Sequence, residues 1–502
     1  MSSQKKQGEY ILVIDQSTSA TKVMLFDNGA NLIHRVSLPH QQYYPADGYV
    51  EHDPMEILEN TVNGMSEILR VKGIKTTDLA VVSITNQRET SLIWDRTTGK
   101  PITNAAVWQC QRGKDYCQSL KEQGYGLMIR QKTGLIIDPY FSASKLYWIM
   151  NNISGAKEKA ENGDLLLGTI DSWLLWKLTN GKVHATDFSN ACRTMLFNIN
   201  TLKWDEELIF LFDLHPSMFP EVKFSDQIFG YTEPSVVFDA PVAIAGLLGD
   251  SHAALFGQNC FEPGMVKATY GTGSSIMMNI GDKPLAAPDG LVTSIGYGRD
   301  GKIDYVFEGN IHCTGDTINW LVNDAELISS SAESEQLALS VNDNNQVYFV
   351  PAFVGLGAPY WDNRARASIS GMARNTKKAH IVRAALESIP YQIKDLIDLM
   401  LENASIPFRE MRVDGGPTRN NFLMQFQSDM LHKTVVRSNI EEISGLGTAF
   451  MAGLAVGLWE NLEEIKSLRK TDKTFKPVMS ANEVERLYSG WKMAVRRVRL
   501  TE

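Results

Sequence analysis

Residues 11–27, ILVIDQSTSATKVMLFD, are two apolar runs separated by a short stretch of small polar residues. The first run ends in Asp15, and the second begins after Lys22. Apolar runs of this length, joined by a small polar turn, are typical of two strands that form a hairpin. The small side chains of the turn also let backbone N–H groups approach an anion closely. The sequence therefore opens on a predicted strand-turn-strand unit able to hold a phosphate.

The same pattern returns in the second half of the chain, in residues 266–278, VKATYGTGSSIMM. Further strands are expected at 79–85 and 242–248, and long helices at 379–403 and 444–459. Asp53-Pro54 predicts a helix start, with Asp53 as the cap and Glu56 reaching back to it. Two such turns in different halves favour an α/β chain of two domains, 1–255 and 256–502. A single large α/β domain with coincidental turns is the alternative.

Composition narrows the class of protein. The 502 residues carry 43% hydrophobic side chains and a formal charge of −9, without a basic run, which argues against nucleic-acid binding. No apolar stretch approaches about 18 residues, so no membrane span is expected. The N-terminus lacks the apolar core of a signal peptide, and a cytoplasmic location is expected. The five cysteines are scattered without zinc-site spacing and are expected to be reduced, packed thiols (Cys110, Cys117, Cys192, Cys260, Cys313).

Two aspartates stand where phosphoryl transfer needs carboxylates. The chain has no Gly-x-x-x-x-Gly-Lys-Ser/Thr loop and no protein-kinase catalytic loop, which excludes those two kinase classes. Asp15 ends the first strand and can meet a metal ion, and Asp250 ends a later strand and can accept a hydroxyl proton. By position alone, either residue is equally an ordinary turn-capping aspartate. A third glycine-containing loop, 412–416, can also approach a nucleotide.

Four longer motifs stand out along the chain. They are ITNQRET at 84–90, AVWQC at 106–110, DPYFS at 138–142 and VDGG at 413–416. In these motifs, and in family signatures at 140–152 and 367–387, the chain resembles the FGGY family of carbohydrate kinases, and its glycerol-phosphorylating branch in particular. The resemblance spans about residues 10–491. It implies an α/β fold of two actin-like (ribonuclease H-like) ATPase domains, each with a central mixed sheet flanked by helices, around an interdomain cleft.

The resemblance also implies the cofactors and the site. ATP and Mg²⁺ are expected, with the polyol pocket and first phosphate loop in 1–255, and the second phosphate loop and adenosine site in 256–502. Asp15 matches the metal-site carboxylate, and Asp250 the general base. The residues expected to contact the polyol are Arg88, Glu89, Trp108, Tyr140 and Asp250. Those expected around the nucleotide are Thr18, Ser19, Lys22, Thr272, Gly273, Gly315, Asn319, Gly415, Gly416 and Asn420.

The chain departs from the family pattern beside the expected base. Ser251 and Ser275 stand where a glutamine and a phenylalanine are usual, so the pocket is expected to be roomier and more polar. The expected reaction is phosphorylation of a terminal hydroxyl of glycerol to sn-glycerol 3-phosphate. The alternative is a longer polyol, a tetritol or pentitol, or another sugar of the family. His252 is either a polar wall of this pocket or a packed histidine.

Two further expectations concern assembly and class. The family is commonly dimeric or tetrameric, which predicts a homodimer or homotetramer. A non-catalytic actin-like protein is the alternative from another class. A repressor of that kind needs a helix-turn-helix before the first phosphate loop, and only about ten residues precede it.

Overall fold

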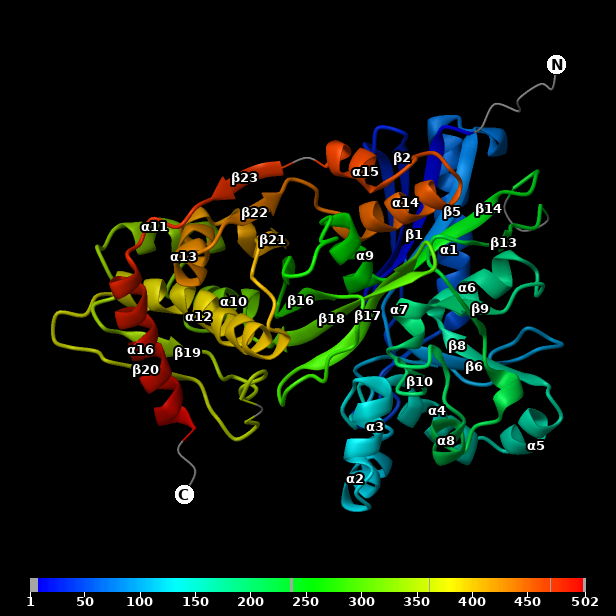
Figure 1. The fold of residues 1–502 in the computed structure, drawn as a ribbon, viewed down its shortest axis with the longest axis horizontal. Helices are drawn as coiled ribbons and strands as arrows, with labels where there is room; N and C mark the ends of the chain where they lie inside the picture. The colour runs from blue at the N-terminus through cyan, green and yellow to red at the C-terminus, as the bar shows by residue number, and fades with distance from the viewer. Residues whose placement is uncertain (1–7, 235–237, 361, 470, 500–502) are drawn as a thin grey trace.

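The computed structural model describes residues 8–234, 238–360, 362–469 and 471–499. Two large mixed sheets form its frame (Figure 1). The first has the order β13-β14-β5-β1-β2-β3 and the second β17-β18-β16-β15-β21-β22-β23, so the prediction of two α/β domains with mixed sheets is confirmed. The first sheet contains β1 (Tyr10–Gln16), β2 (Ala20–Asp27), β3 (Leu32–Pro39), β5 (Leu79–Asn86), β13 (Ile228–Tyr231) and β14 (Ala243–Gly249). The second contains β15 (Val266–Tyr270), β16 (Ser274–Gly281), β17 (Val292–Arg299), β18 (Lys302–Ile311), β21 (Met411–Asp414), β22 (Val435–Ser438) and β23 (Thr471–Phe475).

Both predicted strand-turn-strand units are hairpins. β1 pairs antiparallel with β2, placing Asp15 opposite Lys22, and β15 pairs antiparallel with β16. On its other side β1 runs parallel to β5, and β15 runs parallel to β21. Each of the two turns therefore joins two inner strands of its sheet and lies at the edge where those strands end.

A smaller sheet and the remaining helices complete the fold. The small sheet has the order β4-β7-β6-β8 and carries the segments around Arg88 and Trp108. Its strands are β4 (Glu51–His52), β6 (Ser91–Asp95), β7 (Ala105–Ala106) and β8 (Leu165–Thr169). The helices beside it are α2 (Lys114–Glu122), α3 (Gly126–Thr133), α4 (Ser142–Asn152), α5 (Ala156–Glu161), α6 (Ile170–Leu178), α7 (Phe188–Ala191) and α8 (Glu206–Leu211). Those of the second half are α10 (Gly315–Asn323), α11 (Ser331–Leu339), α12 (Lys378–Ala404), α13 (Asn421–Leu431), α15 (Leu462–Leu468) and α16 (Ala481–Val498).

The predicted helix start at Asp53 is confirmed, although its capping box is not. The Asp53 carboxylate accepts a hydrogen bond from the Met55 N–H at 2.8 Å, and α1 runs Pro54–Lys72. The Glu56 carboxylate instead accepts from the backbone N–H of Gln41 at 3.1 Å. Glu56 thus ties the helix to the segment after β3 rather than to its own cap.

The first sheet is covered on one face by helices from both halves of the chain. Ile11, Val13, Met24 and Phe26 belong to one buried cluster with residues of α9 (Asp250–Gly257) and α14 (Ile443–Ala455). Figure 1 shows α14 beside β1 and β2, two strands that lie far from it in the sequence. The close packing of α14 on α9 requires small residues, because a Cβ at Gly447 of α14 would lie 1.8 Å from the carbonyl oxygen of Ala253 in α9. The predicted boundary at 255/256 falls within α9 and stays a prediction.

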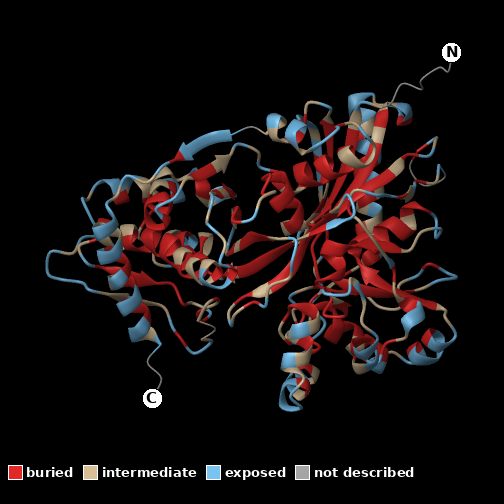
Figure 2. Cartoon of the chain, viewed as in Figure 1, coloured by how far each residue is buried: buried red, intermediate tan, exposed pale blue. Residues whose placement is uncertain are grey.

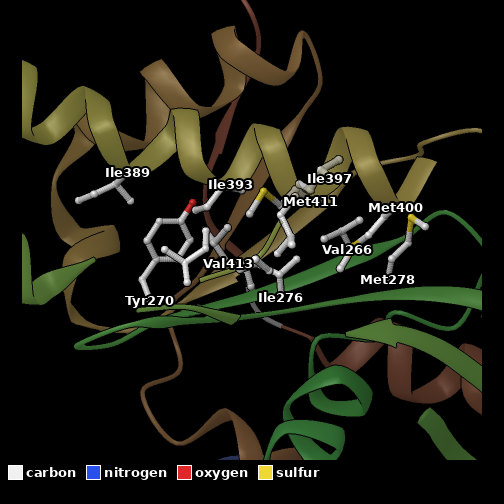
Figure 3. Close-up of a cluster of buried hydrophobic side chains, with 14 of the residues drawn as sticks. Val266, Tyr270, Ile276, Met278, Ile389, Ile393, Ile397, Met400, Met411 and Val413 are labelled. Atoms are coloured by element: carbon white, nitrogen blue, oxygen red, sulfur yellow. The ribbon is translucent and has the colours of Figure 1, made fainter. Parts of the chain in front are cut away.

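The second sheet packs against the long helix α12. Val266, Tyr270, Ile276 and Met278 face Ile389, Ile393, Ile397 and Met400 of the helix (Figure 3). Buried residues follow both sheets through the molecule, while the outer side of α16 and much of α2 and α3 are exposed (Figure 2). All five cysteines are free and buried, as predicted. None of the helices in the described ranges has the length and apolar character that crossing a bilayer requires.

Asp395 in α12 anchors the C-terminal helix α16. Its buried carboxylate accepts hydrogen bonds from Tyr488 (2.5 Å) and Trp491 (2.8 Å), both in α16, and from Tyr360 (2.9 Å). Burial raises the pKa of Asp395 from 3.8 to about 6. A carboxyl whose pKa is raised on folding stabilises the fold below its unfolded pKa, and this contribution is lost as pH rises through the folded pKa.

Asp395→Asn is therefore expected to reduce the pH dependence of stability between pH 4 and pH 7. The free energy of unfolding of the parent minus that of the variant should be larger at pH 4 than at pH 7, by about 2 kcal/mol. Urea titrations of both proteins at the two pH values measure this difference. An equal difference at both would show that Asp395 does not titrate in this window.

Candidate active site

Five of the residues predicted around the nucleotide line one cavity of 570 Å³ between β15, α10 and α13. The backbone fixes its floor, since Gly315 N–H donates to the Gly271 carbonyl at 2.9 Å and Asp316 N–H to that of Thr272 at 3.1 Å. A Cβ at Gly315 would lie 2.6 Å from the Gly271 oxygen, so glycine is required there. The cavity has the size of a small-molecule site. The five residues are Thr272, Gly315, Asn319, Gly416 and Asn420.

Gly415 and Gly416 line a second cavity of 520 Å³ beside the first. Gly415 has φ 100°, and a Cβ there would lie 2.1 Å from the Tyr270 carbonyl oxygen. Only glycine fits this conformation and this close approach to β15. Gly273 lines neither cavity, and a Cβ there would lie 2.3 Å from the Ile311 oxygen. Its role toward the nucleotide stays a prediction.

The first turn is engaged with other parts of the chain. Thr18 Oγ1 accepts a hydrogen bond from Trp108 Nε1 at 3.0 Å, and the Ser19 carbonyl accepts from the His40 N–H at 3.4 Å. Lys22 Nζ donates to Glu442 at 2.8 Å, immediately before α14. These three residues lie apart from the 570 Å³ cavity, and their predicted phosphate contacts stay predictions.

Asp15 has the character of a cation ligand. The residue is 6% exposed, and its carboxyl group accepts no hydrogen bond from any of the described residues. Burial raises its pKa from 3.8 to about 7, with Lys22 acting against that change. A buried carboxylate without donors gains most from a nearby cation, and Mg²⁺ is commonly held by one or two carboxylates together with substrate phosphates. No cluster of three or more His, Cys, Asp or Glu side chains that could hold a metal ion is found within the described ranges.

Arg88 and Glu89 are both buried, so they are not the surface pair that adjacent opposite charges usually form. Arg88 Nη1 and Nη2 donate to the two Glu308 oxygens at 3.1 and 2.9 Å, and Arg88 Nε lies 3.2 Å from Asp250 Oδ1. Glu89 Oε1 accepts from Arg193 Nε at 2.6 Å. The two neighbours in sequence thus bind different partners.

Glu89 also has an unusual backbone conformation. Its φ is 62°, and the Thr90 N–H donates to the Arg88 carbonyl at 2.7 Å, closing a three-residue turn around it. The Glu89 carbonyl accepts from Ser142 Oγ at 2.9 Å. Left-handed backbone at a non-glycine residue costs ~1–3 kcal/mol and is concentrated at functional sites. The turn points consecutive side chains, Arg88 and Glu89, toward one region of the molecule.

Trp108 and Tyr140 form an aromatic wall with ring centroids 5.6 Å apart. Lys145 Nζ fixes the backbone around Tyr140, because it donates hydrogen bonds to the carbonyls of residues 139, 140 and 141 at 2.9, 2.6 and 2.9 Å. Burial lowers the pKa of Lys145 to about 8. The wall offers the apolar faces that the carbon chain of a polyol requires.

Asp250 begins α9, directly after β14, and its side chain is 40% exposed. The two substituted positions meet beside it, since Ser275 Oγ lies 3.5 Å from Ser251 Oγ. His252 is fully buried, neither ring nitrogen has a hydrogen-bond partner among the described residues, and burial holds its pKa well below the ordinary value. Of the two interpretations of His252, the structure therefore supports the packed histidine.

The 570 Å³ cavity lies in the second half of the chain, and the cluster of Arg88, Glu89 and Asp250 follows β5 and β14 of the first sheet. Family models identify this two-sheet architecture: the FGGY carbohydrate kinase N-terminal domain matches residues 10–257, and the C-terminal domain matches 266–456. The chain belongs to the FGGY family of carbohydrate kinases. It is therefore a phosphotransferase with an alcohol group as acceptor, and it uses ATP.

Individual relatives are similar over nearly the whole chain. A glycerol kinase of Caldanaerobacter subterraneus subsp. tengcongensis is 50% identical over 97% of this chain and 98% of its own length. Glycerol kinase 1 of Thermotoga maritima is 50% identical over 98% of this chain and 100% of its own. The structure of Plasmodium falciparum glycerol kinase with ADP superimposes with a TM-score of 0.94, at 38% identity, covering 99% of each chain.

Proposed function

We propose that this protein phosphorylates a terminal hydroxyl of glycerol with ATP and Mg²⁺, giving sn-glycerol 3-phosphate. The observation that carries the proposal is the contact between Arg88 Nε and Asp250 Oδ1 at 3.2 Å beside Glu89, whose partner Arg193 lies against the Tyr140 ring. Together with the Trp108 ring next to Tyr140, these groups offer donors, acceptors and an apolar face, as a short polyol requires. The glycerol kinases at 50% identity over nearly full length support the same substrate.

Asp250 acts as the general base in this proposal. Its carboxylate accepts the proton of the attacking hydroxyl as that oxygen forms a bond to the γ-phosphorus of ATP. The bond from phosphorus to the bridging oxygen breaks, and ADP leaves with that electron pair. Arg88 Nε lies 3.2 Å from Asp250 Oδ1 and orients the base. Asp15 would hold Mg²⁺, which spreads the charge of the phosphates when bound.

A coupled assay of ADP release over a panel of acceptors tests the substrate. Glycerol is expected to have the highest kcat/KM, above a tetritol, a pentitol and a ketopentose. Turnover of one of these with glycerol inert would overturn the proposal for glycerol while leaving the kinase class intact. No turnover of any polyol would overturn the proposed function itself.

Refilling the pocket beside the base is expected to tighten glycerol binding. Ser251→Gln with Ser275→Phe restores a hydrogen-bonding side chain and an apolar face, and should lower KM for glycerol by about 10-fold. KM for ATP should not change, and any tetritol turnover should fall. Steady-state kinetics of the double variant measure this.

Ser275→Ala serves as the matched control, because it removes a hydroxyl without adding volume. It is expected to leave KM for glycerol within twofold of the parent. A double variant with unchanged or higher KM would mean that the serine pair does not border the bound polyol.

Two further expectations remain part of the proposal. The enzyme is assigned to the cytoplasm, in keeping with its free buried thiols. A homodimer or homotetramer is expected from family habit. Sedimentation of the purified protein measures the assembly state directly.

A further inference from the structure

Two residues that no motif singled out, Arg193 and Glu308, join the expected polyol ligands into one buried network. Arg193 follows α7, and Glu308 lies in β18 of the second sheet. Both side chains are at most 1% exposed. Arg193 Nη1 donates to Glu308 Oε2 at 2.7 Å and to Ser294 Oγ at 2.7 Å, while its Nε donates to Glu89 at 2.6 Å. The order of contacts is Glu89–Arg193–Glu308–Arg88–Asp250.

The charges in this network alternate in sign. Two guanidinium groups and two fully buried carboxylates balance each other, and the partly exposed Asp250 stands at the end of the network. The guanidiniums of Arg193 and Arg88 hold the pKa of Glu308 well below its usual range against the effect of burial. A buried charge is tolerated when it is paired and hydrogen-bonded, whereas removing one partner leaves an uncompensated charge. Glu308 and the two guanidinium groups therefore depend on one another for their ionised states.

The network leaves specific polar atoms free to meet a substrate. Glu308 takes one hydrogen from each terminal nitrogen of Arg88, and Asp250 faces Nε. A guanidinium carries five N–H groups, so one hydrogen on each terminal nitrogen stays available. Glu89 uses Oε1 with Arg193, and in the described part of the chain no hydrogen bond to Oε2 is recorded. Two donors and one acceptor are thus kept in fixed directions.

Resting on the proposed function, we propose that Arg193 and Glu308 are positioning residues for the polyol pocket. Glu308 fixes the plane of the Arg88 guanidinium, and Arg193 fixes the Glu89 carboxylate. Arg193 also lies 5.9 Å from the centroid of the Tyr140 ring, so it contacts the aromatic wall. Because Glu308 belongs to the second sheet, the affinity for the polyol depends on contact between the two halves of the chain.

The competing explanation is that Arg193 and Glu308 have a purely structural role and only stabilise the contact between the two halves of the chain. It predicts lower thermal stability with normal kinetics once the protein is folded. A positioning role predicts a specific loss of polyol binding, because a small misplacement of ligands costs up to about 100-fold. The readouts are therefore KM for glycerol, KM for ATP, and the shift in Tm that saturating glycerol causes.

Glu308→Gln and Arg193→Lys test the proposal. Glu308→Gln keeps the shape but removes a charge, and Arg193→Lys keeps the charge but removes the fork. Each is expected to raise KM for glycerol by about 10- to 100-fold, with KM for ATP within twofold. The glycerol-induced rise in Tm should be largely lost in both. Glu308→Asp, which keeps the charge and shortens the side chain by one methylene, should fall between Glu308→Gln and the parent.

Glu387→Gln is the matched control. Glu387 of α12 is a buried carboxylate that accepts hydrogen bonds from Arg383 of the same helix (2.7 Å) and from Asn344 outside it (2.8 Å). The substitution should lower Tm without changing KM for glycerol. If Glu308→Gln and Arg193→Lys behave like this control, the positioning role is wrong. If the parent protein phosphorylates no polyol, the proposed function fails instead, so the two failures are distinguishable.

Discussion

Asp250→Asn is expected to lower kcat for glycerol phosphorylation by about 10²- to 10⁴-fold, the usual contribution of a general base. Asparagine keeps the size of the side chain and the hydrogen bond that Oδ1 accepts from the Ser251 N–H at 2.6 Å, but it cannot accept the hydroxyl proton. KM for ATP should stay within twofold, since the nucleotide cavity lies in the second half of the chain. Steady-state kinetics and a thermal melt of the variant measure these quantities.

The side chain of Asp250 is 40% exposed, so the variant is expected to fold normally, and its Tm should match that of the parent. Ser275→Ala, which changes a neighbouring hydroxyl without touching the base, provides the activity reference. Full activity in Asp250→Asn would show that another group accepts the proton.

Asp15→Asn is expected to lower kcat/KM for Mg-ATP by about 100-fold or more. The carboxylate is buried without a recorded donor in the described residues, so the amide removes the charge that would hold Mg²⁺. Raising the Mg²⁺ concentration should restore part of the activity, because weakened binding is opposed by mass action. Initial rates over a Mg²⁺ titration, at fixed glycerol, measure the effect.

Burial raises the pKa of Asp15, so neutralising it should not destabilise the apo protein, and Tm without ligands is expected to rise or stay constant. Asp395→Asn, another buried carboxylate far along the chain, should leave the Mg²⁺ dependence unchanged. If Asp15→Asn depends on the Mg²⁺ concentration as the parent does, Asp15 does not hold the metal ion.

The sequence predicted the local units well because their causes are local. The hairpins around Asp15 and Gly271 follow from alternating apolar runs and small turns, and the start of α1 follows from Asp53-Pro54. The 570 Å³ cavity brings together Thr272, Gly315 and Gly416, which the family resemblance had assigned to the nucleotide. Sequence patterns and motifs are enough to predict these features, because each depends on the backbone conformation of a few neighbouring residues.

The partners of buried charges could not be predicted in this way. Arg88 binds Glu308, 220 residues further along the chain, and Arg193 binds Glu89 across 104 residues. An isolated arginine or glutamate in the sequence is usually exposed, and nothing local marks Glu308 in a strand as buried. The hydrogen bond from Lys22 to Glu442 joins residues 420 positions apart. Such pairs depend on how the two sheets meet, which is a property of the tertiary structure.

The return of α14 to the first sheet constrains how the protein is made. Ile11 and Met24 are synthesised early, yet α14, the helix that covers them, begins only at Ile443. At about 5–20 residues per second, the stretch between α9 and α14 takes roughly 10–40 s to synthesise. Throughout that interval an apolar face of the nascent N-terminal half is uncovered, a ready target for chaperones and a hazard for aggregation. A fragment ending near residue 255 lacks α14 and would keep this face uncovered, so it is expected to aggregate more readily than the whole chain.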